Sequence, residues 1–234
     1  RMIKVESISD NVRKYLADCI FKGDFCPGQQ IKEQDVASQL GISRPPVREA
    51  LKLLEGDGLI VRKPNHGAFV TRITKKDAWE IYSLKSVLYG MATELAFSHI
   101  TPKNIREWEV IVGEMEKCVV ADPPDILEYQ TLHQKFHDLM IDTAGHGRLK
   151  KVAEMLHNQV KRFSSRSLAQ KRHLEESLFY HKKILASIKQ GDAQVTVKLT
   201  KDHISMALEY IQDLTVEETE QGHLEKRQKP VAMA

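Results

Sequence analysis

The sequence predicts a mainly α-helical chain of two domains, a small one with helices and a hairpin followed by a larger all-helical bundle. Its 234 residues suit a domain of about 70 residues followed by one of about 150. The composition contains only 6% aromatic residues and is rich in helix formers such as alanine, leucine, lysine and glutamate. Apolar residues recur at three- and four-residue spacing along most of the chain, as in amphipathic helices.

Charge and cysteine usage indicate an anionic partner and a reducing compartment. Residues 1–73 contain 12 Lys and Arg against 9 Asp and Glu, whereas the rest of the chain contains 23 of each. Cationic side chains drive much of nucleic-acid affinity, although an excess of three charges also arises by chance. The three cysteines are an odd count without close pairing, and no cationic apolar leader or transmembrane run is found. We therefore expect a cytoplasmic protein without a membrane partner.

The first elements are a helix and a turn. Ser9 or Asp10 can cap a helix whose apolar residues recur until Gly23. Pro27-Gly28 forces a turn, and a short extended piece follows at Gln30-Ile31.

Two short helices then predict a helix-turn-helix. One covers residues 33–40 and stops at Gly41, and the other covers residues 44–55. Ser43 suits the N-cap of the second helix, and Pro45-Pro46 suits its first turn. In a helix-turn-helix the second helix enters the DNA major groove by its first residues.

Arg44 and Arg48 are the candidate base-reading residues. Their spacing of four places both on one face of the third helix, opposite an apolar stripe. Arginine can form two hydrogen bonds with guanine O6 and N7. The alternative is an exposed helix with solvated charges.

A predicted hairpin follows and forms a wing. Residues 59–62 and 68–71 read as strands around a turn-rich tip at residues 63–67. The tip presents Lys63, Asn65 and His66, which can reach a phosphate or the minor groove. The N-terminal third is therefore a predicted winged helix-turn-helix.

This third resembles the GntR family of bacterial regulators over about residues 5–73. The segments that carry the resemblance are Pro27-Gly28, Gly41-Ile42-Ser43-Arg44-Pro45-Pro46-Val47-Arg48-Glu49-Ala50-Leu51, Leu53-Glu55-Gly58-Leu59 and Asn65-His66-Gly67-Ala68-Phe69-Val70. The resemblance implies that Arg44 and Arg48 contact DNA bases. It also implies that residues near Gln34, Ser43 and Pro46 contact the DNA backbone, and that His66 and Gly67 contact the minor groove. It further implies a homodimer on a palindromic operator. We expect a repressor, although the sequence gives no sign of repression versus activation.

The remaining chain predicts a helical bundle over residues 74–214. Six helices are expected, at residues 75–98, 103–121, 125–143, 148–168, 171–190 and 192–214. The first has an apolar stripe formed by Ile81, Leu84, Leu88, Met91 and Leu95. The polar tail, residues 215–234, lacks such a stripe and is expected to fray unless the last helix continues.

Four histidines of this bundle are candidate metal ligands. His133 and His137 share a helix face, and His181 and His203 each lie among apolar residues, so all four are expected to point inward. Neutral imidazole suits Zn²⁺, Ni²⁺, Co²⁺ or Cu²⁺. The alternative for each is a core histidine satisfied by hydrogen bonds. Five others are expected at the surface, namely His99, His146, His157, His173 and His223.

Residues 75–214 resemble the FCD sensing domain of the same regulators. The segments that carry it are Leu132 to Leu139 with Phe136-His137, then Tyr180-His181, Ile184-Leu185, Ala186-Ile188, Gly191-Asp192 and His203. The resemblance implies a divalent metal, for which we expect Zn²⁺ or Ni²⁺, and a small carboxylate effector. Six helices rather than seven place the chain nearer the VanR-like branch of this family than the acyl-CoA-binding one.

Two positions depart from the family pattern. His133 stands where Asp is common, and Lys85 stands where Arg often faces the sensor cavity. Lys85 and Arg162 are candidate effector-binding residues, with a solvated lysine as the alternative for Lys85.

Other functions fit less well. His133-Gln134-Lys135-Phe136-His137 resembles the zinc-protease motif H-E-x-x-H, but Gln134 replaces the glutamate that acts as general base. A nucleoid-type DNA-binding protein would need no inward polar cluster. The sequence therefore predicts a transcription regulator and not an enzyme.

Overall fold

The computed structural model describes residues 7–64 and 66–228, and the side chains of these except 162, 165 and 215–228. The chain divides into two compact units, with Ile73 at the end of one and Thr74 at the start of the other; Met155–Arg162 groups with the first. Asn65, predicted at the hairpin tip, lies outside the described residues.

Helix α1, Ile8–Lys22, begins two or three residues earlier than predicted, because its N-cap is Ser7 and not Ser9 or Asp10. The Ser7 hydroxyl accepts a hydrogen bond from the Asp10 backbone N–H at 3.1 Å. The Asp10 carboxylate in turn accepts from the Ser7 backbone N–H at 3.3 Å. The prediction of Ser9 or Asp10 as the cap was wrong because Asp10 is the reciprocal partner three residues into this capping box.

Helices α2, Glu33–Leu40, and α3, Arg44–Gly56, form the predicted helix-turn-helix. Gly41 ends α2 with a φ of 64°, a left-handed conformation that glycine adopts at little cost. Ser43 is the N-cap residue of α3, but its side chain makes no capping hydrogen bond. Two prolines in the first turn need no such acceptor, since they lack the N–H groups that a cap would satisfy.

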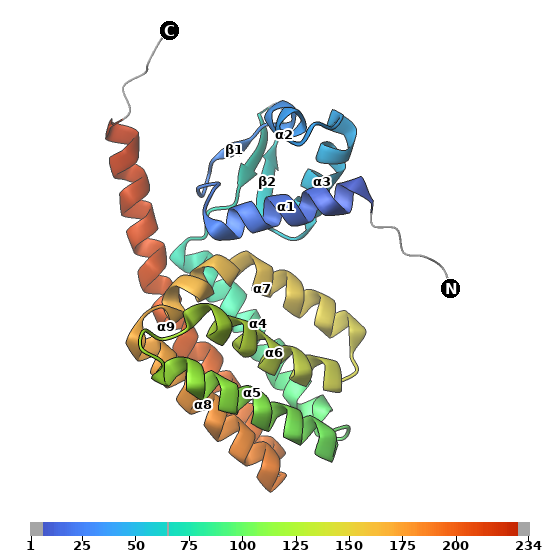
Figure 1. The fold of residues 1–234 in the computed structure, drawn as a ribbon, viewed down its shortest axis with the longest axis vertical. Helices are drawn as coiled ribbons and strands as arrows, with labels where there is room; N and C mark the ends of the chain where they lie inside the picture. The colour runs from blue at the N-terminus through green and yellow to red at the C-terminus, as the bar shows by residue number, and fades with distance from the viewer. Residues whose placement is uncertain (1–6, 65, 229–234) are drawn as a thin grey trace. The chain divides into compact units, whose positions relative to one another are not determined.

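A small sheet completes the first unit (Figure 1). Its strands are β1, Gln30–Ile31, β2, Ile60–Lys63, and β3, Gly67–Val70, in the antiparallel order β1-β3-β2. The hairpin starts one residue later than predicted because the Leu59 N–H bonds to the Leu54 carbonyl at the end of α3. One face of the sheet joins α1, α2 and α3 around a shared apolar core.

The described part of the chain after residue 73 contains the six predicted helices. They are α4, Lys75–Ala96, α5, Pro102–Val120, α6, Ile126–Thr143, α7, Gly147–Leu168, α8, Lys171–Gln190, and α9, Ala193–Gln228. Helix α9 continues past the predicted end at residue 214. Residues 215–228 are rich in Glu, Gln, Lys and Arg, which favour helix without an apolar stripe.

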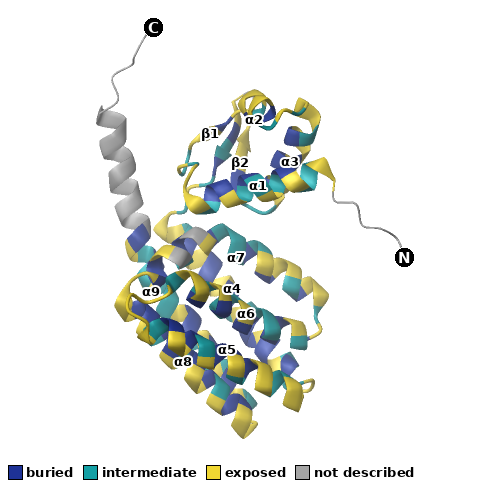
Figure 2. Ribbon diagram, in the orientation of Figure 1, coloured by how far each residue is buried: buried dark blue, intermediate teal, exposed yellow. Residues whose placement is uncertain are grey.

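The helices of the second unit pack around a common interior. Helix α4 packs against α6 and α9, α5 packs against α6 and α8, and α8 packs against α9. Figure 2 shows the buried residues along the facing sides of these helices. The interior holds large side chains such as Trp108, whose indole N–H bonds to the Phe136 carbonyl at 3.1 Å. Over residues 7–64 and 66–228, the structure has no helix long and apolar enough to cross a membrane.

The buried face of α4 differs from the predicted stripe. Ile81 is buried as expected, but Leu84 is 55% exposed and Met91 is 44% exposed. The interior is instead lined by Ala78, Ile81, Tyr82, Lys85, Tyr89, Ala92 and Ala96. Apolar residues occur around most of the α4 circumference, so periodicity did not identify the inner face. One consequence is that Lys85 lies inside the bundle.

Candidate functional site

The predicted base-reading arginines lie on the exposed side of α3. The side chains of Arg44 and Arg48 are 56% and 48% exposed. The opposite side of the helix is anchored in the core by Val47, Leu51 and Leu54. A rigid helix therefore presents two guanidinium groups to solvent, one turn apart.

The other predicted DNA-contacting residues are also accessible. Gln34 on α2, and Lys63, His66 and Gly67 on the hairpin, are exposed, as is Ser43, and Pro46 is half-buried. The Gln30 side-chain amide donates to the His66 carbonyl at 2.7 Å. The sequence alone did not identify this link, which ties β1 to the hairpin tip 36 residues later.

Glu33 is a site residue that the sequence analysis missed. Its carboxylate accepts from Arg48 Nε at 3.1 Å, from Arg48 Nη2 at 3.0 Å and from Arg44 Nη2 at 3.2 Å. The hydrogen bonds from Arg48 contribute most to holding the pKa of Glu33 below its ordinary value. Arg44 and Arg48 follow Glu33 by 11 and 15 positions in the chain. Only the fold of the turn therefore brings the three side chains together.

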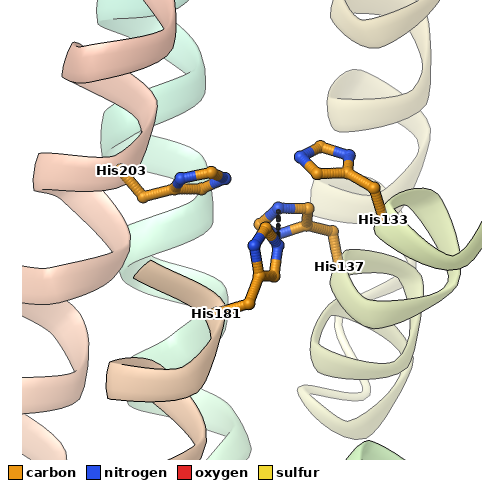
Figure 3. Close-up of side chains that lie close together, drawn as sticks. All are labelled: His133, His137, His181 and His203. Atoms are coloured by element: carbon orange, nitrogen blue, oxygen red, sulfur yellow. Dashed lines mark hydrogen bonds between the residues drawn. The ribbon is translucent and has the colours of Figure 1, made fainter. Parts of the chain in front are cut away.

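The structure brings together the four predicted metal ligands in the second unit. His133 and His137 come from α6, His181 from α8 and His203 from α9, and one ligand atom of each lies within 4.8 Å of the others. Figure 3 shows the imidazole rings converging from the two sides of the bundle. His137, His181 and His203 are buried and His133 is half-buried.

A hydrogen-bond chain fixes the orientation of His181. Its Nδ1 lies 2.6 Å from the Ser177 carbonyl oxygen. Because a carbonyl only accepts, Nδ1 carries the proton and Nε2 carries the lone pair. The Ser177 hydroxyl accepts in turn from Tyr129 Oη at 2.9 Å. The sequence did not identify these two supporting residues, which resemble the outer partners that orient ligating histidines in metal sites.

Two members of the cluster, His181 and His203, are held in the neutral form at pH 7. Burial lowers the pKa of His181 to about 4 and the pKa of His203 well below its ordinary value. The Nδ1 atom of His203 is buried without a hydrogen-bond partner. Neutral imidazoles with available lone pairs are the form that binds a transition metal.

The size of the cluster suits one ion. His181 Nε2 and His137 Nε2 are 3.3 Å apart (Figure 3). With zinc–nitrogen bonds of about 2.0–2.1 Å, the ligand atoms of a tetrahedral ion are about 3.3–3.4 Å apart, which the His181–His137 pair already matches. The widest separation, within 4.8 Å, needs side-chain adjustments that sum to about 1.4 Å. The residues present fit a divalent metal with nitrogen ligands.

A buried lysine lies beside this cluster. Lys85 is 6% exposed, and its ammonium lies 4.9 Å from the Tyr82 ring and 5.5 Å from the Tyr89 ring. The Tyr89 ring also makes an edge contact with His137. Burial lowers the pKa of Lys85 to about 8, and no described carboxylate pairs with it. The side chain of Arg162, the other effector candidate, lies outside the described residues.

His173 corrects a prediction. Expected at the surface, it is 3% exposed, and its ring stacks on Tyr210 of α9 at a centroid distance of 4.3 Å. Burial lowers its pKa to about 4, and its Nδ1 has no hydrogen-bond partner. The sequence could not indicate this because the stacking partner is on another helix.

Comparisons with known proteins find two family matches along the chain. Residues 8–70 match the family of bacterial regulatory proteins of gntR type, and residues 80–206 match the FCD domain. The chain is 29% identical to the HTH-type transcriptional regulator YdhC of Bacillus subtilis (strain 168), covering 86% of this chain and 90% of that protein.

Two further similarities concern a named repressor and a solved structure. The chain is 24% identical to the probable D-xylose utilization operon transcriptional repressor of Paenarthrobacter nicotinovorans, covering 86% of this chain and 88% of that protein. The solved structure of McbR/YncC from E. coli superimposes with a TM-score of 0.74 at 21% identity, over 90% of this chain and 99% of that one. The structural likeness extends through both units.

Proposed function

Because this chain belongs to the GntR family of bacterial regulatory proteins and carries an FCD domain, we propose that it is a homodimeric repressor controlled by a metal ion and a small carboxylate. It is a DNA-binding transcription regulator and not an enzyme, as the sequence analysis predicted. The observation that supports metal control is the convergence of four imidazoles, with one ligand atom of each within 4.8 Å of the others. A regulator of bacterial DNA works in the cytoplasm, where that DNA is.

The proposed reader of the operator is the exposed side of α3 with the hairpin as a wing. Arg44 and Arg48 contact bases in the major groove, while Gln34, Ser43 and Pro46 contact the backbone. Lys63, His66 and Gly67 reach the phosphates or the minor groove from the hairpin. One chain contains one such reader, so a palindromic operator requires two copies.

Replacing Arg48 with alanine is expected to reduce sequence-specific binding by about 1–3 kcal/mol, roughly 5- to 150-fold, because a two-bonded contact with guanine is lost. The operator is first obtained by selecting random duplex DNA with the full chain, and affinity is measured by fluorescence anisotropy. Arg106→Ala removes an exposed arginine of α5 and serves as the charge-matched control. Full retention of operator preference by Arg48→Ala would refute the role of Arg48.

The proposed metal centre is held by His133, His137, His181 and His203. A bound ion would supply positive charge and an attachment point for an anionic ligand, and Zn²⁺ or Ni²⁺ suits the all-nitrogen set. Ser177 and Tyr129 hold His181 in the orientation that keeps its Nε2 available. The nucleoid-type alternative offers no reason for a buried polar cluster of this kind.

Lys85 is the proposed contact for the effector. A buried ammonium with no carboxylate partner beside a cation-binding cluster favours a ligand with negative charge. A small carboxylate fits because it can meet the ammonium and the metal together. Effector and metal alter operator affinity only by binding one arrangement of the dimer better than another.

The test is a gel-shift titration of the full chain on the selected operator. Protein treated with a chelator is compared with protein loaded with Zn²⁺ or Ni²⁺, each with and without a panel of mono-, di- and tricarboxylates. We expect operator affinity to change by about 5- to 150-fold in at least one combination. Equal affinity in every combination would overturn the sensor role and leave the DNA-binding role intact.

Lys85→Met tests the role of Lys85 in this response, because methionine keeps a long apolar side chain and lacks the ammonium group. This variant is expected to bind metal as the parent does and to lose the response to carboxylates.

A further inference from the structure

We infer that Glu33 is a positioning residue for DNA recognition, which holds Arg44 and Arg48 in the conformation that reads bases. The inference depends on the proposed function of these two arginines. Glu33 is the first residue of α2, and its side chain is 20% exposed, against 48% for Arg48 and 56% for Arg44. The carboxylate thus lies beneath two more exposed guanidinium groups.

The geometry leaves the base-reading edge of Arg48 available. Glu33 is bound by Nε and Nη2, the side edge of the guanidinium. Of the five N–H groups, both of Nη1 and one of Nη2 stay available at the end of the side chain. That end can form the paired hydrogen bonds to guanine O6 and N7 while Glu33 holds the side edge.

Both arginines are linked through one carboxylate oxygen. Glu33 Oε2 accepts from Arg44 Nη2 at 3.2 Å and from Arg48 Nη2 at 3.0 Å. A mobile arginine loses side-chain entropy when it binds a base, and a side chain already held in place loses less. Glu33 therefore lowers the cost of base recognition by both residues.

The charge of Glu33 acts in the same direction. Two arginines one turn apart attract any phosphate backbone, whatever its sequence. An ionised carboxylate between them reduces their net charge from two to one and so weakens non-specific binding. Glu33 is expected to raise the ratio of specific to non-specific affinity by both effects.

The experiment compares the full chain with its Glu33→Gln variant on the selected operator and on a scrambled duplex of equal length. Glutamine keeps the size of the side chain and one acceptor oxygen but removes the charge. We expect operator affinity to fall about 10-fold, while affinity for the scrambled duplex stays equal or rises. The slope of affinity against salt on the scrambled duplex should become steeper.

Glu49→Gln is the matched control. Glu49 is on α3 and pairs with Lys52 at 2.8 Å, so this variant removes a negative charge near Arg48 from the same helix-turn-helix but keeps the hydrogen bonds that both arginines donate to Glu33. It should leave the ratio of the two affinities unchanged. In an Arg48→Ala background, Glu33→Gln should lower that ratio less than it does in the parent chain.

The outcomes separate Glu33 from the function on which it depends. An equal loss on both duplexes would show that Glu33 only supports α2 and would overturn the inference. An unchanged ratio in Glu33→Gln, together with a reduced ratio in Arg48→Ala, would also overturn it while leaving the reader in place. Failure of the parent chain to select any sequence would count against the reader itself.

Discussion

Replacing His181 with alanine is expected to reduce the affinity for Zn²⁺ or Ni²⁺ by more than about 100-fold. Loss of an outer hydrogen-bond partner of a ligand typically costs about 10- to 100-fold, and here the ligand itself is removed. His181 is central because its Nε2 lies 3.3 Å from His137 Nε2 and its ring contacts those of His133 and His203. Metal content after dialysis and calorimetric titration of the chelator-treated protein measure the effect.

Two further variants keep this prediction testable if the buried change disturbs folding. His133 is half-buried, so His133→Ala perturbs packing less and should still weaken binding. His133→Asp supplies an oxygen ligand at the position where the family often has Asp, and should retain a metal with a preference moved toward harder ions. His99→Ala changes an exposed histidine beyond the end of α4 and is the control. Metal affinity that is unaffected in both His181→Ala and His133→Ala would exclude this cluster as the site.

Acid is expected to destabilise the metal-free protein by about 4 kcal/mol per pH unit as the pH falls from about 6.5 toward 4. Burial lowers the pKa of His173 and of His181 to about 4 and the pKa of His203 well below its ordinary value, whereas all three have an ordinary pKa near 6.5 when the chain unfolds. Between these values the unfolded chain binds more protons, so stability falls with pH by about 1.4 kcal/mol per unit for each group. Above pH 6.5 these groups are neutral in both states and contribute no pH dependence.

Denaturant unfolding in the presence of a chelator, from pH 7.5 to pH 5, measures this slope. This pH range lies above the ordinary pKa values of carboxylates, so they contribute little to the slope. His173→Phe is the matched variant, because phenylalanine can keep the ring contact with Tyr210 but cannot take up a proton. It should reduce the slope by about a third. A slope near zero in the parent protein, or an equal slope in His173→Phe, would contradict the assignment.

Much of the first unit could be predicted because its signals are local. Gly41, the two prolines of α3 and the turn residues of the hairpin each determine backbone conformation within a few positions, so α2 and α3 begin where predicted. The boundary errors at α1 and at the strands arose where one hydrogen bond decided between neighbouring residues. Glu33 was missed because ion pairs across a turn leave no pattern in the sequence.

In the second unit the sequence by itself determined that there are helices and that His133 and His137 share one face, since both follow from spacing along one helix. Only the tertiary structure decided that His181 and His203 approach that face, that Lys85 rather than Leu84 is inside, and that His173 is buried. The physical reason is that periodicity shows which residues share a side of a helix, whereas the partner helix and the rotation of each helix depend on packing in three dimensions. For this protein the chemistry of the candidate metal centre was in the sequence, but its assembly from α6, α8 and α9 was a property of the fold.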